Sequence, residues 1–391
     1  MKTYNNKILL VYFLYLFIGC IFYLNLNINE FPSKYVFTDW LINYEGGFVR
    51  RGLLGQLIFD ISNIFNFDIK SIILFFQVTI YSVYFFIFYL ILSKIKTNFF
   101  WFLIIFSPIL FLYPLSELEA LGRKDIFVIT IFLIFSIMNY KSLNILLLSF
   151  IVLFSLSSLI HEITFFYIFH YLFIIYIKNK IQIKQKSKIH HYILILFLIL
   201  ILLYFNLYQH NFVVIQEIVN SYNFEDFTTK SGSFSHISPS INNVLIKTLH
   251  NISILSILRY GWLLMIGIFP IIYFIKINNK HENKYFNLKN IIFIFLLASI
   301  PLYMLIFDWG RVIYINYNFF IIILVFLFKL GLFDGSHLTN KLNKFNNKLK
   351  VFIFIIFCLA YAPKILVTDD LASFPLYRSI IKIFKISTTY Y

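Results

Sequence analysis

Apolar residues run along the chain in blocks of about 17 to 25 residues, and short polar segments separate the blocks. A helix of about 20 apolar residues is long enough to cross the hydrocarbon core of a bilayer. The pattern therefore predicts an all-α, polytopic integral membrane protein with about eleven transmembrane helices. The expected spans are 8–27, 71–93, 98–114, 126–139, 143–160, 163–177, 191–208, 257–276, 291–307, 317–333 and 351–366.

The composition agrees with this pattern. Hydrophobic residues fill 60% of the 391 positions, whereas soluble domains typically contain ~45–50%. A single multi-pass membrane domain is therefore expected over residues 1–391. No small-residue cleavage site follows the first apolar block, so the first span is expected to stay uncleaved. Cys20 and Cys358 both lie inside apolar blocks, which favours neither a disulfide framework nor a thiolate metal site.

The distribution of charge predicts the orientation of the spans. The net charge is +16, but the lysines gather in short clusters between apolar blocks, which is typical of membrane orientation and not of nucleic-acid binding. With the N-terminus inside and the C-terminus outside, the inner segments hold 19 of the 33 basic residues. They hold only Glu282 and Asp334 of the 17 acidic residues. The outer segments are then about 28–70, 115–125 and 209–256, with an outer tail at about 367–391.

Two outer segments have a pattern of their own. The stretch after Arg51 is amphipathic, which predicts a helix lying in the outer interface. Its apolar face contains Leu54, Ile58, Ile61 and Phe65, and its polar face contains Gln56, Asp60 and Asn63. The segment 209–256 is polar in its middle and is either a lid over a site or a disordered loop.

The first outer segment contains the first candidate binding cluster, in the sequence FTDWLINYEGGFVRRGLLG. Two arginines on the outer side require an explanation, because positive charge is disfavoured there. Guanidinium groups match phosphate oxygens, and the glycines nearby let the backbone approach an anion closely. Arg50 and Arg51, with Asp39 and Glu45, are therefore candidate substrate-binding residues. The alternative is that the arginines pair with these two carboxylates or touch lipid headgroups.

Two further clusters stand at the ends of expected spans. Arg123 and Lys124, in SELEALGRKD, either bind substrate or belong to a solvated turn, and Asp125 is a candidate cap of the span that follows. His161 and Glu162 meet at the junction of two spans, where partial burial would raise the pKa of the carboxyl and suit it to act as a general base. The alternative is a helix start with polar caps.

The fourth cluster is DWGR, at the outer end of the span 291–307. Asp308 and Arg311 are three residues apart, so they form either a mutual ion pair or a base beside a phosphate clamp. No metal site is predicted. Phe165 stands four residues after His161, where the zinc motif HExxH requires histidine. No cofactor is expected, although the sequence leaves a divalent metal open.

Taken together, GGFVRRGLLG, LGRKD, the His161-Glu162 step and DWGR resemble the multi-pass proteins of bacterial surface-polysaccharide clusters, especially O-antigen and capsule repeat-unit polymerases. The resemblance extends loosely over most of the chain. More distantly, the chain resembles polytopic glycosyltransferases that use polyprenyl-linked sugars and carry acidic residues in the first outer loop. No paired-acid motif stands in that loop here, which disfavours a metal-dependent reaction.

The resemblance implies an enzyme of the bacterial inner membrane that polymerises polyprenyl-pyrophosphate-linked oligosaccharides at the outer leaflet. Other membrane proteins of polysaccharide assembly are then possible partners. Arg50, Arg51 and Arg311 would bind the diphosphate. Glu162, assisted by His161, would take the proton of the acceptor hydroxyl, with Asp308 as a further candidate catalytic group. Arg123 and Lys124 would hold the second lipid-linked unit, and Asp39 and Glu45 would contact substrate.

Two other functions agree with the same sequence. One is a glycosyltransferase that adds a single sugar from a polyprenyl phosphate donor. The other is a transporter or flippase of lipid-linked glycan, which performs no chemistry. Transporters place ionisable groups near the middle of the bilayer. The expected spans hold almost none there apart from His170, which the sequence indicates to be a hydrogen-bonded interior residue.

Overall fold

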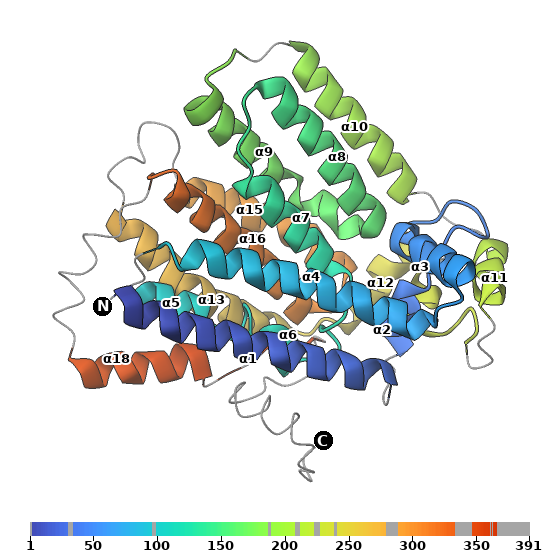
Figure 1. Cartoon of the computed structure of the whole chain (residues 1–391), viewed down its shortest axis with the longest axis horizontal. Coiled ribbons are helices and arrows are strands. Elements are labelled where there is room, and N and C mark those ends of the chain that lie inside the picture. Colours follow the sequence, from blue (N-terminus) through green and yellow to red (C-terminus); the bar gives the residue numbers. More distant parts are fainter. Residues whose placement is uncertain are drawn as a thin grey trace, which may run out of the picture. The chain divides into compact units, whose positions relative to one another are not determined.

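The computed structural model is helical throughout the part of the chain that it describes, with no strand in these residues (Figure 1). The described residues are 2–29, 34–95, 99–186, 189–207, 212–222, 227–237, 241–278, 288–332, 346–359, 361 and 363–365. The all-α prediction is thus confirmed for them. The expected outer tail at about 367–391 lies outside the described residues, as do Glu282 and Asp334.

Five of the described helices are long and apolar enough to cross a membrane. They are α1 (Lys2–Asn29), α4 (Ile69–Leu92), α8 (Leu143–Ile160), α13 (Ile254–Asn278) and α16 (Trp309–Lys329). Shorter apolar stretches form α3 (Gly52–Phe65) and α7 (Asp125–Ile137), and others lie at 193–202 within α10 (Ile189–Leu207) and at 290–305 within α15 (Leu288–Leu305). The described part of the chain is therefore helical and contains five candidate membrane spans. The larger count of about eleven stays a prediction, as does the orientation.

The remaining elements are short. They are α2 (Lys34–Trp40), α5 (Phe99–Ile105), α6 (Tyr113–Ser116), α9 (Ile168–Lys178), α11 (Phe212–Ser221), α12 (Ile241–Asn251) and α18 (Asn347–Phe354). Two 3₁₀ helices, η1 (Glu162–Tyr167) and η3 (Gly232–His236), and two π-helical turns, η2 (Asn179–Ile183) and η4 (Ile355–Leu359), complete the described part.

Four expected spans differ from the helices observed. The block 163–177 begins in the 3₁₀ helix η1, and α9 starts only at Ile168. The block 98–114 is not one helix, because α5 ends at Ile105 and turns follow it. Pro108 explains the break, since proline has no N–H to donate and disfavours helical backbone before it. The span expected at 317–333 begins earlier, at Trp309. Of the block 351–366, the helical part in the described residues ends at Leu359.

The chain forms two compact units, each assembled from separate stretches. Unit 1 contains Met1–Leu26, Tyr81–Gly122 and Thr248–Tyr391. Unit 2 contains Asn27–Ile80 and Arg123–Lys247. The SELEALGRKD cluster is divided by this boundary, so that its two glutamates belong to unit 1 and its last three charged residues to unit 2.

Unit 1 is organised around α16, in which every residue from Trp309 to Leu327 is buried. The helix keeps its polar residues satisfied inside the unit. Asn318 accepts a short hydrogen bond from the Tyr84 hydroxyl and donates to the backbone oxygen of Tyr314 at 2.8 Å. Asn316 donates to the Tyr303 hydroxyl at 3.0 Å. These contacts explain why a helix continues through residues whose polarity ends the hydrophobic pattern.

Unit 2 packs α8 against α7, α9 and α10, while α2 and α3 form a corner over a common core (Figure 1). Trp40 and Ile58 from this corner are fully buried with Ile218 of α11. The corner is tight at Gly55, where a Cβ atom would lie 1.9 Å from the backbone oxygen of Ile42. Only glycine fits there, so α3 packs directly against the backbone segment that follows α2.

Candidate functional site

The site in unit 2 begins with an unusual backbone conformation at Arg51. This residue precedes α3 with a φ of 65° in the left-handed region, which costs a residue with a side chain of order 1 kcal/mol or more. Its backbone oxygen accepts a hydrogen bond from Lys124 Nζ at 2.8 Å. The strained turn is therefore fixed by Lys124, the residue directly before α7.

Arg51 holds two carboxylates with one guanidinium group. Its Nε donates to Glu162 Oε2 at 2.6 Å, and Nη2 donates to Glu162 Oε1 in a second, short bond. Its Nη1 donates to Asp39 Oδ1 at 3.3 Å. The first two contacts form the parallel, bidentate arrangement in which arginine binds a carboxylate most strongly. Segments 12 and 111 residues away from Arg51 in the sequence meet here.

Lys124 lies directly before α7 and is fully buried. The pKa of its ammonium is lowered to about 8, chiefly by burial and also by the neighbouring charge of Arg51, although Asp39 and Glu162 act in the opposite direction. A positive charge at a helix N-terminus also opposes the helix dipole. Lys124 is thus held in an unfavourable position that the two carboxylates partly offset.

His161 connects Glu162 to α7. It ends α8 in an extended conformation, and its Nδ1 accepts a hydrogen bond from the backbone N–H of Ile163 at 3.2 Å, which makes it a helix cap. The same Nδ1 lies 3.3 Å from Glu162 Oε2, and Nε2 lies 3.6 Å from Asp125 Oδ1. The capping alternative is therefore confirmed for His161, and the residue still touches Glu162.

The pKa expected for Glu162 is wrong in sign. Burial does act to raise the pKa of this carboxyl, but the charges of Arg51, His161 and Arg50 and the hydrogen bonds from Arg51 together lower it well below its ordinary value. Burial also acts to raise the pKa of Asp39, and Lys124, Arg51, His161 and Arg123 outweigh it. Both carboxylates are ionised in this state, and Glu162 is a weak base while Arg51 holds it.

The unit 2 charge cluster is defined from here on as Asp39, Arg51, Lys124, Asp125, His161 and Glu162. Two cations flank it. Arg123, which is half-buried, acts electrostatically on Asp39. Arg50, also half-buried, acts on Glu162, and its Nη2 donates to the backbone oxygen of His236 at 2.6 Å.

Glu45 is not in the cluster. It is exposed, and its Oε1 accepts a hydrogen bond from Gln56 Nε2 at 3.1 Å. Of the two pairings considered for the arginines, the one between Arg51 and Asp39 is confirmed. Glu162, the partner that the sequence did not pair with Arg51, makes the closer contact.

The segment 227–237 is ordered, which settles part of the choice between a lid and a disordered loop. Phe234 of η3 is buried, Ser233 N donates to Thr38 Oγ1 at 2.8 Å, and Ser233 Oγ donates to the backbone oxygen of Tyr35 at 2.8 Å. These bonds pack η3 against α2. Residues 209–211, 223–226 and 238–240 of the expected loop lie outside the described residues.

Asp308 and Arg311 belong to unit 1. Arg311 Nη1 donates to Asp308 Oδ2 at 2.9 Å, so the ion-pair alternative describes them. Both stand at the start of α16, where Gly310 is pressed against backbone: a Cβ atom there would lie 1.8 Å from the oxygen of Lys364. Glu117 of the same unit lies 3.8 Å from Lys364 Nζ.

One buried charge, Lys178, was not singled out by the sequence analysis. Its Nζ donates to the backbone oxygens of Phe135 and Met138 at 2.6 and 2.7 Å and lies 4.4 Å from the centre of the Tyr140 ring. The signal was present in the sequence, because Lys178 continues the i, i+4 face that begins at the buried Ile174.

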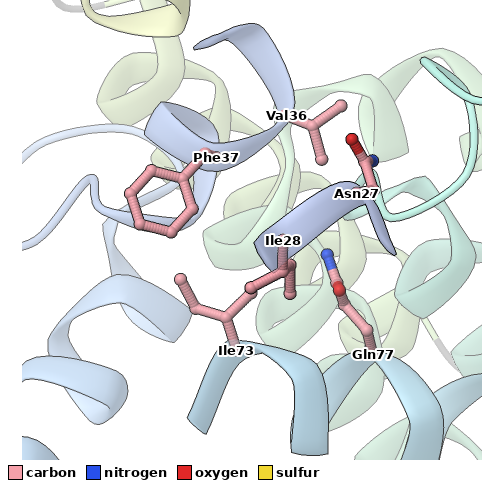
Figure 2. A pocket seen from close by; sticks show the side chains of 6 residues that line it. All are labelled: Asn27, Ile28, Val36, Phe37, Ile73 and Gln77. Atoms are coloured by element: carbon pink, nitrogen blue, oxygen red, sulfur yellow. The ribbon is translucent and has the colours of Figure 1, made fainter. Parts of the chain in front are cut away.

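Unit 2 also contains a small pocket, which Figure 2 shows between the end of α1, α2 and α4. It is lined by Asn27, Ile28, Val36, Phe37, Ile73 and Gln77. Its empty volume of about 200 Å³ is below the ~300–1,000 Å³ of typical small-molecule sites. Among the described residues, no three His, Cys, Asp or Glu side chains are grouped closely enough to hold a metal ion.

No protein-family model, no curated protein and no solved structure matches the chain.

Proposed function

We propose that this chain is a membrane enzyme of glycan assembly. It would transfer an oligosaccharide from a polyprenyl diphosphate carrier to the sugar of a second lipid-linked unit, at the outer leaflet of the bacterial inner membrane, and so polymerise repeat units. The proposal is supported by the five candidate membrane spans in the described residues and by the resemblance of the arginine and histidine motifs to those of repeat-unit polymerases. Above all it is supported by the bidentate contact of Arg51 with Glu162.

The charge of the site favours an anionic substrate. Four described cations belong to the unit 2 charge cluster or flank it, against three carboxylates, and His161 adds to the positive side whenever it is protonated. The cations are Arg50, Arg51, Arg123 and Lys124, and the carboxylates are Asp39, Asp125 and Glu162. A net positive site partly enclosed by protein attracts a diphosphate more strongly than a neutral sugar.

The site is also accessible to a ligand at the ion pair between Arg51 and Glu162. The side chains of Arg51 and Glu162 are 19% and 20% exposed, whereas that of Asp39 is 7% exposed. A ligand can therefore meet the outer side of the Arg51–Glu162 pair while Asp39 stays covered. Guanidinium groups at this edge would bind the diphosphate and stabilise the charge that develops on it.

In the reaction, the acceptor hydroxyl oxygen attacks the anomeric carbon of the donor sugar and forms the new glycosidic bond. The bond from that carbon to the diphosphate oxygen breaks, and its electron pair leaves with the diphosphate. The hydroxyl proton passes to the Glu162 carboxylate, beside which His161 Nδ1 lies at 3.3 Å. Arg51 and Arg50 are the cations that act on this carboxylate and border the site.

The test is the length of the surface glycan on a gel, in a strain that lacks the gene and is complemented with variants. We expect E162Q and R51A to reduce the ladder to lipid carrying a single repeat unit, at normal protein levels. E217Q is the matched control, because Glu217 is an exposed carboxylate of α11 in the same unit, and it should restore the full ladder.

Other outcomes of the same gel separate the rival functions. Loss of one sugar from an otherwise complete unit would indicate a single-sugar transferase. A full ladder in both E162Q and R51A would contradict the proposed roles of these two residues, and an unchanged profile in the deletion strain itself would contradict polymerisation.

A further inference from the structure

We propose that a diphosphate exchanges with Glu162 on the guanidinium of Arg51, and that the carboxylate released in this way becomes the base of the reaction. The inference rests on the proposed function, and it explains how a carboxylate that is bound to arginine in the free protein can accept a proton later. Substrate binding would thus create the base where it is needed.

The geometry suits an exchange because Arg51 is held independently of Glu162. Its backbone oxygen is bonded to Lys124 Nζ at 2.8 Å, and its Nη1 is bonded to Asp39 Oδ1 at 3.3 Å. The two nitrogens that hold Glu162, Nε and Nη2, are the pair that binds two oxygens of one phosphate in the same parallel way. Replacing the carboxylate by a phosphate therefore leaves the rest of the arginine in place.

The same contacts set what happens to Glu162. Its pKa is low because Arg51, His161 and Arg50 outweigh the effect of burial. When the charge of Arg51 is shared with a diphosphate, burial acts with less opposition, and a second anion stands nearby. Both changes raise the pKa of Glu162 and make it a better proton acceptor.

Two measurable consequences follow for inorganic pyrophosphate, the probe for the diphosphate group. Glu162 competes with the probe for Arg51, so E162Q should bind pyrophosphate about tenfold more tightly than the wild type. In the wild type, binding should also be coupled to uptake of a proton by Glu162, because the pKa of its carboxyl rises on binding.

The experiment is isothermal titration of the purified full chain in detergent with pyrophosphate, repeated in buffers of different ionisation enthalpy. The difference between wild type and E162Q removes the protons exchanged by pyrophosphate itself. E217Q should behave as the wild type, and R51A should bind weakly. Thermal unfolding of each variant confirms that it is folded, and proton uptake by the wild type is a second readout that needs no variant of Arg51.

Weaker or equal binding by E162Q, or the same proton uptake in wild type and E162Q, would overturn the exchange while leaving the glycan ladder to decide the proposed function. Absence of pyrophosphate binding to the wild type would overturn the exchange as well. A ladder that depends on Glu162 without any such coupling would retain the function and discard this mechanism.

Discussion

A fully buried lysine lies at each end of α7, and the two stand in opposite electrostatic settings: Lys124 directly precedes the helix, and Lys178 of α9 lies against its C-terminal end. Lys178 donates to the backbone oxygens of Phe135 and Met138 at the C-terminal end, where the helix dipole attracts positive charge. Lys124 precedes the N-terminal end, where the dipole repels it, and its pKa is lowered to about 8 by burial.

The difference separates a residue that serves the fold from one that serves the site. Lys178 satisfies backbone oxygens that the helix leaves without a donor, so its position lowers the energy of the unit. Lys124 donates a hydrogen bond to the backbone oxygen of the strained Arg51 turn, and its charge is offset by Asp39 and Glu162. Such unfavourable placements are typical of functional sites.

The largest effect that tests this comparison is a loss of stability in K178M. The substitution keeps most of the side-chain volume but leaves the backbone oxygens of Phe135 and Met138 without their charged donor, so we expect a loss of about 3 kcal/mol. Thermal unfolding in detergent measures it. K180M is the matched control, because Lys180 lies two residues further on and is exposed. Equal stability of the two variants would contradict the role given to Lys178.

A smaller change in stability is expected for K124M. This variant loses the bond to the Arg51 oxygen but no longer buries a charge at the wrong end of a helix, so the net change should be about 1 kcal/mol. The glycan ladder should nevertheless collapse, because Arg51 is no longer fixed. If K124M unfolds as readily as K178M while polymer stays long, the distinction between the two lysines fails.

The smallest effect is a dependence on alkaline pH. Because the folded-state pKa of Lys124 is about 8, below the ordinary 10.5, the folded protein carries the full cost of the buried charge below pH 8. Between pH 8 and 10.5 the folded protein releases this proton before the unfolded chain does, so the stability of the wild type should rise relative to K124M. The rise should be ~1 kcal/mol or less per pH unit. Parallel pH profiles of wild type and K124M would contradict it.

Much of the helical pattern could be predicted because apolar periodicity and proline are local signals. The break after Ile105 follows from Pro108, which the sequence displays openly. The start of α16 could not be found in this way. Asn316 and Asn318 reduce the hydrophobicity of that stretch, and only their buried partners, Tyr303 and Tyr314, show that the helix continues.

In the site, the chemical types of the residues were predictable and their pairing was not. Charge on the expected outer side singled out Arg51, Asp39, Lys124 and Glu162. The bond from Arg51 to Glu162 joins positions 111 residues apart, which no spacing rule specifies. The direction of the pKa shift of Glu162 was predicted wrongly for the same reason, since it depends on which cation lies beside the carboxylate.

The long separation between Arg51 and Glu162 has a consequence in time. At ~5–20 residues per second, the ribosome makes Glu162 about 6 to 22 s after Arg51. Asp39 precedes Arg51 by 12 residues and is already present, so it can hold the guanidinium during this interval. Replacing Asp39 by asparagine should therefore lower the yield of membrane-inserted protein clearly, while the thermal stability of the protein that has finished folding changes little.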